Sequence, residues 1–240
     1  MVYQADDVYK DLRRRIIEEH LKPGEFLVER DVSVTYSVSR TPAREALRQL
    51  VADGLVVLDR GRGYSVRQLT VEDILEVFVA REAVEGTLAS LATAHADSRF
   101  LDRLAGIRER LEAVDPARQP ARAVNIGGQL HDLLAEAAEN RTLNDFYQKL
   151  RNVAALTRNL SKKTVGVETI SREEHLRIIE AVVKGKRDEA ERQMRLHLRG
   201  TCERMVANYL QRRTASLGFV QAPSEVSSPY ELTDGARFKE

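Results

Sequence analysis

Three histidines are the residues of this 240-residue chain whose spacing best suits a metal site. His175 and His197 lie on either side of a predicted tight turn at Gly185, ten residues before it and twelve after it. At 1.5 Å per helical residue they are about 15 and 18 Å from the turn, so antiparallel packing brings them to nearly the same level. His131 lies in the middle of another helical segment. Three converging imidazoles suit zinc, nickel, iron or a similar divalent metal, with positions left for water or a small ligand.

Arginines near the start of a short predicted helix form a second group that could bind a ligand. The segment 37–66, SVSRTPAREALRQLVADGLVVLDRGRGYSV, combines an apolar helical stripe with Arg44 and Arg48 on the opposite side. Arginine binds guanine O6 and N7 in the major groove through two hydrogen bonds. The N–H groups of a helix N-terminus, together with Thr41, suit phosphate oxygens. The pattern therefore indicates a nucleic-acid-binding surface.

The elements that would position these arginines predict a winged helix-turn-helix over residues 1–67. Thr41 is the expected N-cap of the third helix, Pro42 fits its first turn, and Gly54 ends it. The other expected elements are helices around 8–17 and over 29–36, a turn at 22–25, a buried strand over 55–58, a turn at 60–63 and a returning strand over 64–66. The basic turn between the strands would form the wing.

The histidines require a different architecture, an antiparallel helical bundle over residues 68–213. Thr70–Asp73 and Ser171–Glu174 both match the pattern of a capping box. The expected helices span residues 70–95, 98–113, 120–138, 141–160, 172–184 and 187–212. Residues 214–240 mix Ser, Pro, Gly and charge without periodicity, which predicts a disordered tail. The expected fold is mainly α, with a winged helix-turn-helix followed by an all-α bundle.

Composition indicates a cytoplasmic protein without a membrane partner. The net charge is only +1, so the basic character is local: residues 40–67 contain six arginines. Cys202 is the single cysteine, which excludes an internal disulfide framework and fits a reducing compartment. Apolar runs stay well short of the roughly 20 residues that span a bilayer, and the N-terminus lacks the apolar core of a signal peptide.

The string LKPGEFLVERDVSVTYSVSRTPAREALRQLVADGLVVLDRGRGYSV resembles the DNA-binding domain of GntR-type bacterial transcription regulators. The PG turn, the ER start of the second helix, the VSRTPxREAL helix and the GLV…GxGxxV wing occur in order. The resemblance implies that Gly61 at the wing tip approaches the minor groove, with Arg60 beside it. It implies base or phosphate contacts from Arg30, Ser39, Arg40, Thr41 and Arg44.

The helical half resembles the FCD effector domain of the FadR subfamily over roughly residues 70–210. The motifs LHDLLAEAAEN, EEHLRIIEAV and MRLHL place His131, His175 and His197 at the family's metal-ligand positions. The aspartate that normally stands four residues before the first histidine is replaced by Gly127. A bound water, an effector carboxylate, or no metal at all could be the result. Arg81 matches an arginine that often faces the effector pocket, while a salt bridge to Glu85 is the alternative.

These expectations favour a ligand-responsive transcription regulator. A homodimer would bind a near-palindromic operator, repress a catabolic operon and release the DNA when a small carboxylate or sugar acid binds beside a zinc, nickel or similar ion. A metal-dependent enzyme using the three histidines is the alternative from another class, although Glu136 and Glu174 are the only candidate acid–base groups. An architectural DNA-binding protein without a ligand is the third possibility.

Overall fold

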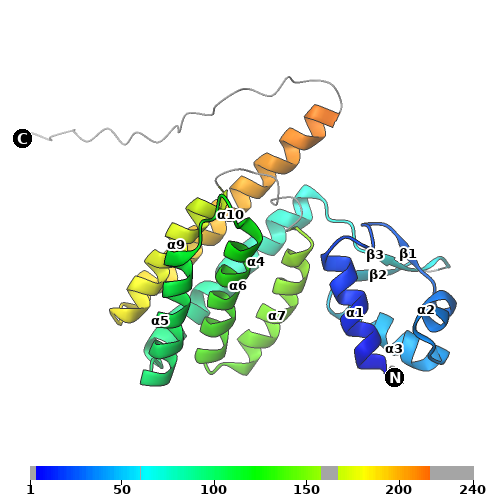
Figure 1. Ribbon diagram of the computed structural model, residues 1–240, viewed down its shortest axis with the longest axis horizontal. Coiled ribbons are helices and arrows are strands. Elements are labelled where there is room, and N and C mark those ends of the chain that lie inside the picture. The colour runs from blue at the N-terminus through cyan, green and yellow to red at the C-terminus, as the bar shows by residue number, and fades with distance from the viewer. Residues whose placement is uncertain (1–3, 60, 158–166, 217–240) are drawn as a thin grey trace, which may run out of the picture.

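The computed structural model describes residues 4–59, 61–157 and 167–216, which form an N-terminal winged-helix unit and a helical bundle (Figure 1). This confirms the expected fold class. The elements of the N-terminal unit are α1 (Ala5–Ile17), β1 (Phe26–Leu27), α2 (Glu29–Tyr36), α3 (Arg40–Ala52), β2 (Val56–Asp59) and β3 (Gly63–Val66). The helices α1 and α3 pack through fully buried side chains such as Val8, Leu47 and Leu50.

A small antiparallel sheet in the order β1-β3-β2 forms the wing. Gly54 has a φ of +72° and follows Asp53, the C-cap of α3, which confirms the predicted glycine stop. The predicted buried strand over 55–58 is only half correct. Leu55 and Val56 are buried, but Leu58 is 56% exposed because β2 is an edge strand that leaves the core as it approaches the wing tip.

The predicted N-cap of α3 was wrong by two residues. The helix begins at Arg40, so Thr41 lies inside its first turn and Ser39 is the N-cap. Ser39 has an extended backbone, with φ −70° and ψ 170°, as N-cap residues do. The Thr41 hydroxyl therefore lies on the exposed first turn of α3.

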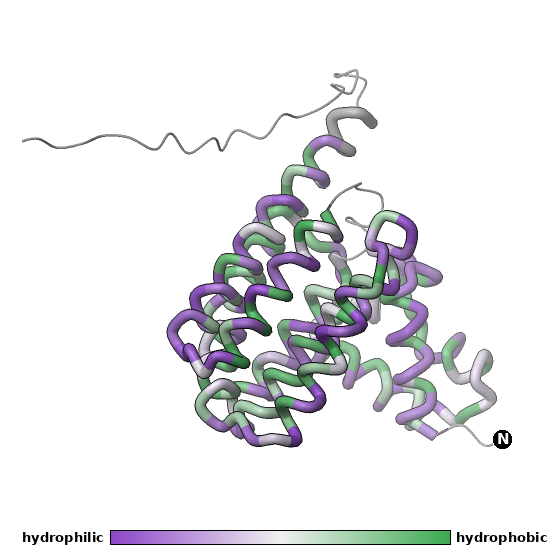
Figure 2. The backbone as a smooth tube through the Cα atoms, turned by 60° about the vertical axis from the view of Figure 1, so that its left-hand side comes forward, coloured by the Kyte–Doolittle hydropathy of each residue, from purple (hydrophilic) through white to green (hydrophobic). Residues whose placement is uncertain are grey.

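The bundle consists of α4 (Val71–Ala94), α5 (Ser98–Ala113), α6 (Pro120–Ala137), α7 (Arg141–Ala155), α9 (Val167–Val183) and α10 (Arg187–Ser216). Thr70 and Asp73 form the predicted capping box of α4. Figure 2 shows hydrophobic and hydrophilic residues alternating along these helices, the pattern of amphipathic helices packed around one core. Within the described ranges, no helix combines the length and apolar character that crossing a bilayer requires.

The helix predicted over 172–184 begins earlier than expected. Since α9 starts at Val167, Ser171 lies inside the helix and is buried, so the predicted capping box at Ser171–Glu174 was wrong. The last helix, α10, continues past the predicted end at residue 212 to Ser216. The remainder of the predicted disordered tail, residues 217–240, lies outside the described residues, as do residues 158–160 of the helix predicted over 141–160.

The C-terminal end of α7 packs against the N-terminal unit (Figure 1). Arg13 on α1 donates a 2.7 Å hydrogen bond from Nη2 to Oδ1 of Asn152 on α7. Leu156, just after the helix, packs on the hydrophobic core of the N-terminal unit. This contact joins the bundle to the unit that carries the arginine-rich helix.

Candidate metal centre and DNA-binding surface

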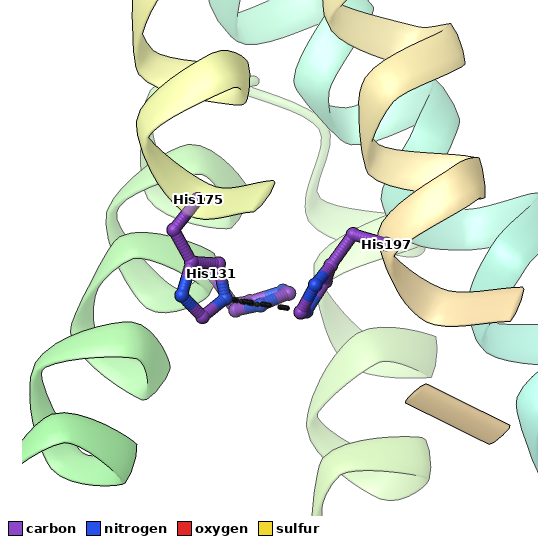
Figure 3. Close-up of side chains that lie close together, drawn as sticks. All are labelled: His131, His175 and His197. Carbon is purple, nitrogen blue, oxygen red and sulfur yellow. Dashed lines mark hydrogen bonds between the residues drawn. The ribbon is translucent and has the colours of Figure 1, made fainter. Parts of the chain in front are cut away.

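The three histidines meet inside the bundle, one each from α6, α9 and α10 (Figure 3). The Nε2 atom of His175 lies 3.2 Å from Nε2 of His131 and 3.2 Å from Nε2 of His197. All three side chains are buried, with at most 8% of each residue exposed. The level placement inferred from the turn at Gly185 is therefore confirmed, and His131 joins the pair from the facing helix.

Two carboxylates, Glu85 buried and Glu174 partly buried, orient two of the rings. Glu85 on α4 lies 2.5 Å from Nδ1 of His131, and Glu174 on α9 lies 2.7 Å from Nδ1 of His197. Burial by itself would raise the pKa of Glu85, but Arg81 and His131 outweigh it and lower this pKa to about 2. An ionised carboxylate only accepts hydrogen bonds, so each Nδ1 carries the proton. The Nε2 atoms of both rings then face the Nε2 atom of His175.

The protonation of the site suits metal ligation. Burial is the largest cause that lowers the pKa of His197 to about 4, and burial also holds the pKa of His175 well below its usual range. These two rings are therefore neutral at pH 7. A proton on Nε2 of His175 can be donated fully to only one neighbour, which leaves at least one buried lone pair without a donor.

A divalent metal ion would give these ring nitrogens a common partner. Imidazole nitrogens bound at about 2.0–2.1 Å lie roughly 3.3 Å apart around a tetrahedral ion and about 2.9 Å apart around an octahedral one. The 3.2 Å separations between His175 and its two neighbours fall within this range, and all three candidate ligand atoms lie within 4.8 Å of one another, so small ring movements would complete the set. The residues present therefore fit a divalent metal with three neutral nitrogen ligands, and the carboxylates of Glu85 and Glu174 serve as the outer groups that such ligands require.

The space that an aspartate side chain at position 127 would occupy is filled by the ring of His175. A Cβ atom at Gly127 would overlap Cε1 of the His175 ring and would lie 3.0 Å from its Nδ1. The glycine on α6 therefore lets the imidazole of α9 pack directly on the helix backbone. The neighbouring acid on α6, Asp132, instead accepts hydrogen bonds from Tyr147 and Arg151, each at 2.7 Å.

A cavity of about 120 Å³ adjoins the three histidines. Arg81 and Arg151 line it from α4 and α7. The two alternatives for Arg81 turn out to be compatible: its Nε donates to Glu85 at 2.6 Å while the side chain lines the cavity. Ligand pockets for drug-sized molecules are about 300–1,000 Å³, so this cavity matches a ligand of a few heavy atoms.

The other expected site residues lie on the N-terminal unit and are exposed. Arg30 lies on α2, with 78% of its side chain accessible, and Ser39, Arg40 and Thr41 surround the N-terminus of α3. Gly61 has a φ of +89° with open space around it, which suits a wing tip, whereas Arg60 lies outside the described residues.

Arg44 makes a contact that sequence reasoning missed. Its Nε and Nη2 donate to the two carboxylate oxygens of Glu29 at 2.9 and 2.8 Å, which links α3 to the start of α2. These hydrogen bonds lower the pKa of Glu29. The guanidinium is half exposed, so it remains accessible at the surface beside Arg40 and Thr41.

The candidate acid–base groups of the enzyme alternative have other roles. Glu136 accepts two hydrogen bonds from Arg103 on the bundle surface, away from the histidines. Glu174 is not a helix cap, as the sequence suggested, but holds His197 and is itself bound by Arg204 at 3.0 and 2.8 Å. Neither carboxylate is placed as a free proton donor or acceptor.

A winged helix with exposed arginines, joined to a helical bundle with an internal cavity, is the architecture of a DNA-binding transcription regulator. Residues 4–66 match the family model described as bacterial regulatory proteins, gntR family, and residues 76–200 match the FCD domain. The chain belongs to the GntR family of bacterial transcription regulators, in the group that carries an FCD domain. It is a regulator and not an enzyme.

Similar proteins carry the same architecture. The uncharacterized HTH-type transcriptional regulator YdhC of Bacillus subtilis is 30% identical over 199 residues, covering 82% of this chain and 88% of YdhC. The HTH-type transcriptional repressor RspR of Escherichia coli is 27% identical over 197 residues, covering 82% and 86%. The solved structure of E. coli McbR/YncC has the same fold, with a TM-score of 0.71 at 17% identity, covering 88% of this chain and all of that one.

The contact between Gly127 and His175 predicts that Gly127→Ala destabilises the protein. The new methyl group must displace a buried ring, and overpacking of this kind costs about 1–3 kcal/mol. Gly106→Ala is the matched control, because Gly106 also lies inside a helix but has open space around it. That variant should gain about 0.5–1 kcal/mol from helix propensity. Urea unfolding measures both, and equal stabilisation by the two substitutions would contradict the close contact.

Proposed function

We propose that this protein is a ligand-responsive repressor that acts as a homodimer on a near-palindromic operator of a catabolic operon in the cytoplasm. A small carboxylate or sugar acid would bind beside a metal ion in the bundle and release the DNA. The observation that carries the proposal is the cavity that combines three histidine nitrogens with Arg81. The name of RspR, a transcriptional repressor, supports the sign of regulation.

The surface around α3 supports the proposed DNA contact. We expect the first turn of α3 to enter the major groove, with Arg40 and Arg44 at base edges and the N–H groups near Ser39 and Thr41 at phosphates. Arg30 would bind the backbone from α2. Gly61 and Arg60 at the wing would approach the minor groove. Two such units on a homodimer would lie about 34–36 Å apart along one face of the duplex, which explains a near-palindromic site.

The proposed binding of a small acid depends on positive charge in the cavity. His131, His175 and His197 would hold zinc, nickel or a similar divalent ion, which when bound supplies a positive charge and open coordination positions for an anion. Because its protein ligands are neutral imidazoles, this charge is not cancelled by the residues that hold it. Arg81 adds a second positive group at the cavity wall, and a guanidinium binds a carboxylate through paired hydrogen bonds. The small cavity favours a small acid.

Replacement of Arg44 tests the DNA-binding surface. We expect Arg44→Ala to weaken binding to a duplex selected by the wild-type protein, by about 1–3 kcal/mol, because a bidentate base contact is lost. Arg108→Ala is the control, since Arg108 is an equally exposed arginine paired with Glu112 on the bundle. Gel-shift titration measures both variants. Wild-type affinity of Arg44→Ala would exclude the proposed docking.

Metal analysis tests the histidine site. We expect one zinc ion per chain in the wild type after loading and dialysis, and none in His175→Ala. Glu85→Gln should weaken zinc binding about 10–100-fold, because the carboxylate that orients His131 is lost. His95→Ala, which changes an exposed histidine near the end of α4, should keep the metal. A wild-type stoichiometry near zero would end the metal hypothesis.

Footprinting tests the function as a whole. The zinc-loaded protein should protect a symmetric site, and a small carboxylate or sugar acid should relieve that protection without being consumed. Consumption of the acid in the presence of metal would favour an enzyme. A footprint that no acid changes would favour an architectural DNA-binding protein.

A further inference from the structure

The C-terminal turn of α7 contacts both the histidine cavity and the N-terminal unit. Arg151 and Ala154 line the cavity beside the three histidines. Between them in sequence, Asn152 and Val153 face the other way. Asn152 accepts the hydrogen bond from Arg13 on α1, and a Cβ on Gly54, directly after α3, would lie 2.9 Å from Val153. One turn of α7, which lies beside the N-terminal unit in Figure 1, thus connects the histidine cavity to α1 and to the segment that follows α3.

Arg151 is incompletely satisfied at this junction. Its Nη2 donates to Oδ2 of Asp132 at 2.7 Å, but its Nε is buried and has no hydrogen-bond partner in the part of the chain that the structure describes. A buried donor without a partner is unfavourable, and more so in a charged group. An acceptor that entered the cavity would remove this cost. The same side chain also lines the cleft between α7 and α1, beside Arg13 and Arg14.

The partner of Arg151 ties it to the histidine site. Asp132 follows His131 directly on α6 and is shared between Arg151 and the buried hydroxyl of Tyr147. An anion bound near His131 would therefore compete with Asp132 for the guanidinium. A shift of the Arg151 backbone toward the cavity would carry Asn152 and Val153 with it, because the three residues are consecutive in one helix.

We propose that Arg151 is an anion-binding residue of the cavity and that the last turn of α7 transmits its occupancy to α1 and α3. The inference rests on the proposed function, because it requires an anionic effector. The anion accepts a hydrogen bond from Arg151, the turn moves, and the Arg13–Asn152 contact that holds the N-terminal unit is changed. Effector and DNA then affect each other's affinity by the same factor, as thermodynamic linkage requires.

The test measures this coupling factor directly. The probes are acetate, malate and gluconate, each titrated by calorimetry into the zinc-loaded full-length protein with and without a selected DNA duplex. The ratio of the two dissociation constants for a probe is the coupling factor, which typically lies between about 5 and 150. If no probe binds the wild type, the proposed effector class fails and the inference fails with it.

Three variants separate the two steps of the inference. Arg151→Gln should bind the probe more weakly and reduce the coupling factor to near one. Asn152→Ala should bind the probe as the wild type does, because Asn152 is not in the cavity wall, and should also reduce the coupling factor to near one. Arg103→Gln is the matched control, since Arg103 bridges to Glu136 on the same helix as Asp132 but outside the cavity. Arg103→Gln should keep the wild-type affinity for the probe and the wild-type coupling factor.

The possible results are distinct. Wild-type probe affinity in Arg151→Gln would overturn the assignment of Arg151 as a ligand. Full coupling in Asn152→Ala would overturn transmission through the turn of α7. A general loss of stability, in contrast, would lower DNA binding with and without the probe and leave the coupling factor unchanged, and this would also overturn the inference. These outcomes concern variants only, so the binding of metal and anion by the wild-type protein is tested independently of them.

Discussion

The arrangement of the bundle depends on keeping three imidazoles buried with their Nε2 atoms close together. Burying these polar rings is unfavourable without hydrogen-bond partners, which Glu85 and Glu174 supply from the surrounding helices. Glu85 holds His131 and is stabilised by Arg81, while Glu174 holds His197 and is stabilised by Arg204. Each buried charge therefore has a counter-charge and a hydrogen-bond partner, the condition under which proteins tolerate ionised groups away from water.

This dependence of the histidines on partners from other helices explains what the sequence could and could not predict. Helical periodicity and the turn at Gly185 were enough to bring His175 and His197 to one level, because helix geometry is regular. The partners of the histidines depend on how helices far apart in sequence face each other. Glu85 was considered only as a local partner of Arg81, and Glu174 was taken for a cap because Ser171 was read as a helix start. Tertiary packing overrode that local pattern.

In the N-terminal unit, too, the local features could be predicted and the contact between helices could not. The order of its elements and the glycine after α3 follow from local sequence chemistry, and the exposed arginines confirm a polar face. The bidentate pair between Arg44 and Glu29 could not be read from the sequence, since it joins residues 15 apart on two helices. In the unbound protein this pair holds the guanidinium in one place. In the proposed docking, Arg44 would exchange this carboxylate for a base edge, so the lost pair would offset part of the affinity for DNA.

The hairpin of α9 and α10 imposes a constraint on the length of the chain. Adding one residue to a helix between His175 and the turn, or between the turn and His197, would rotate that imidazole by about 100° around its axis and out of the group. An insertion there would therefore break up the histidine group even where the inserted side chain is exposed. The loop at Gly185 lies about 15–18 Å along the two helices from the imidazoles and could grow without changing the phase of either arm.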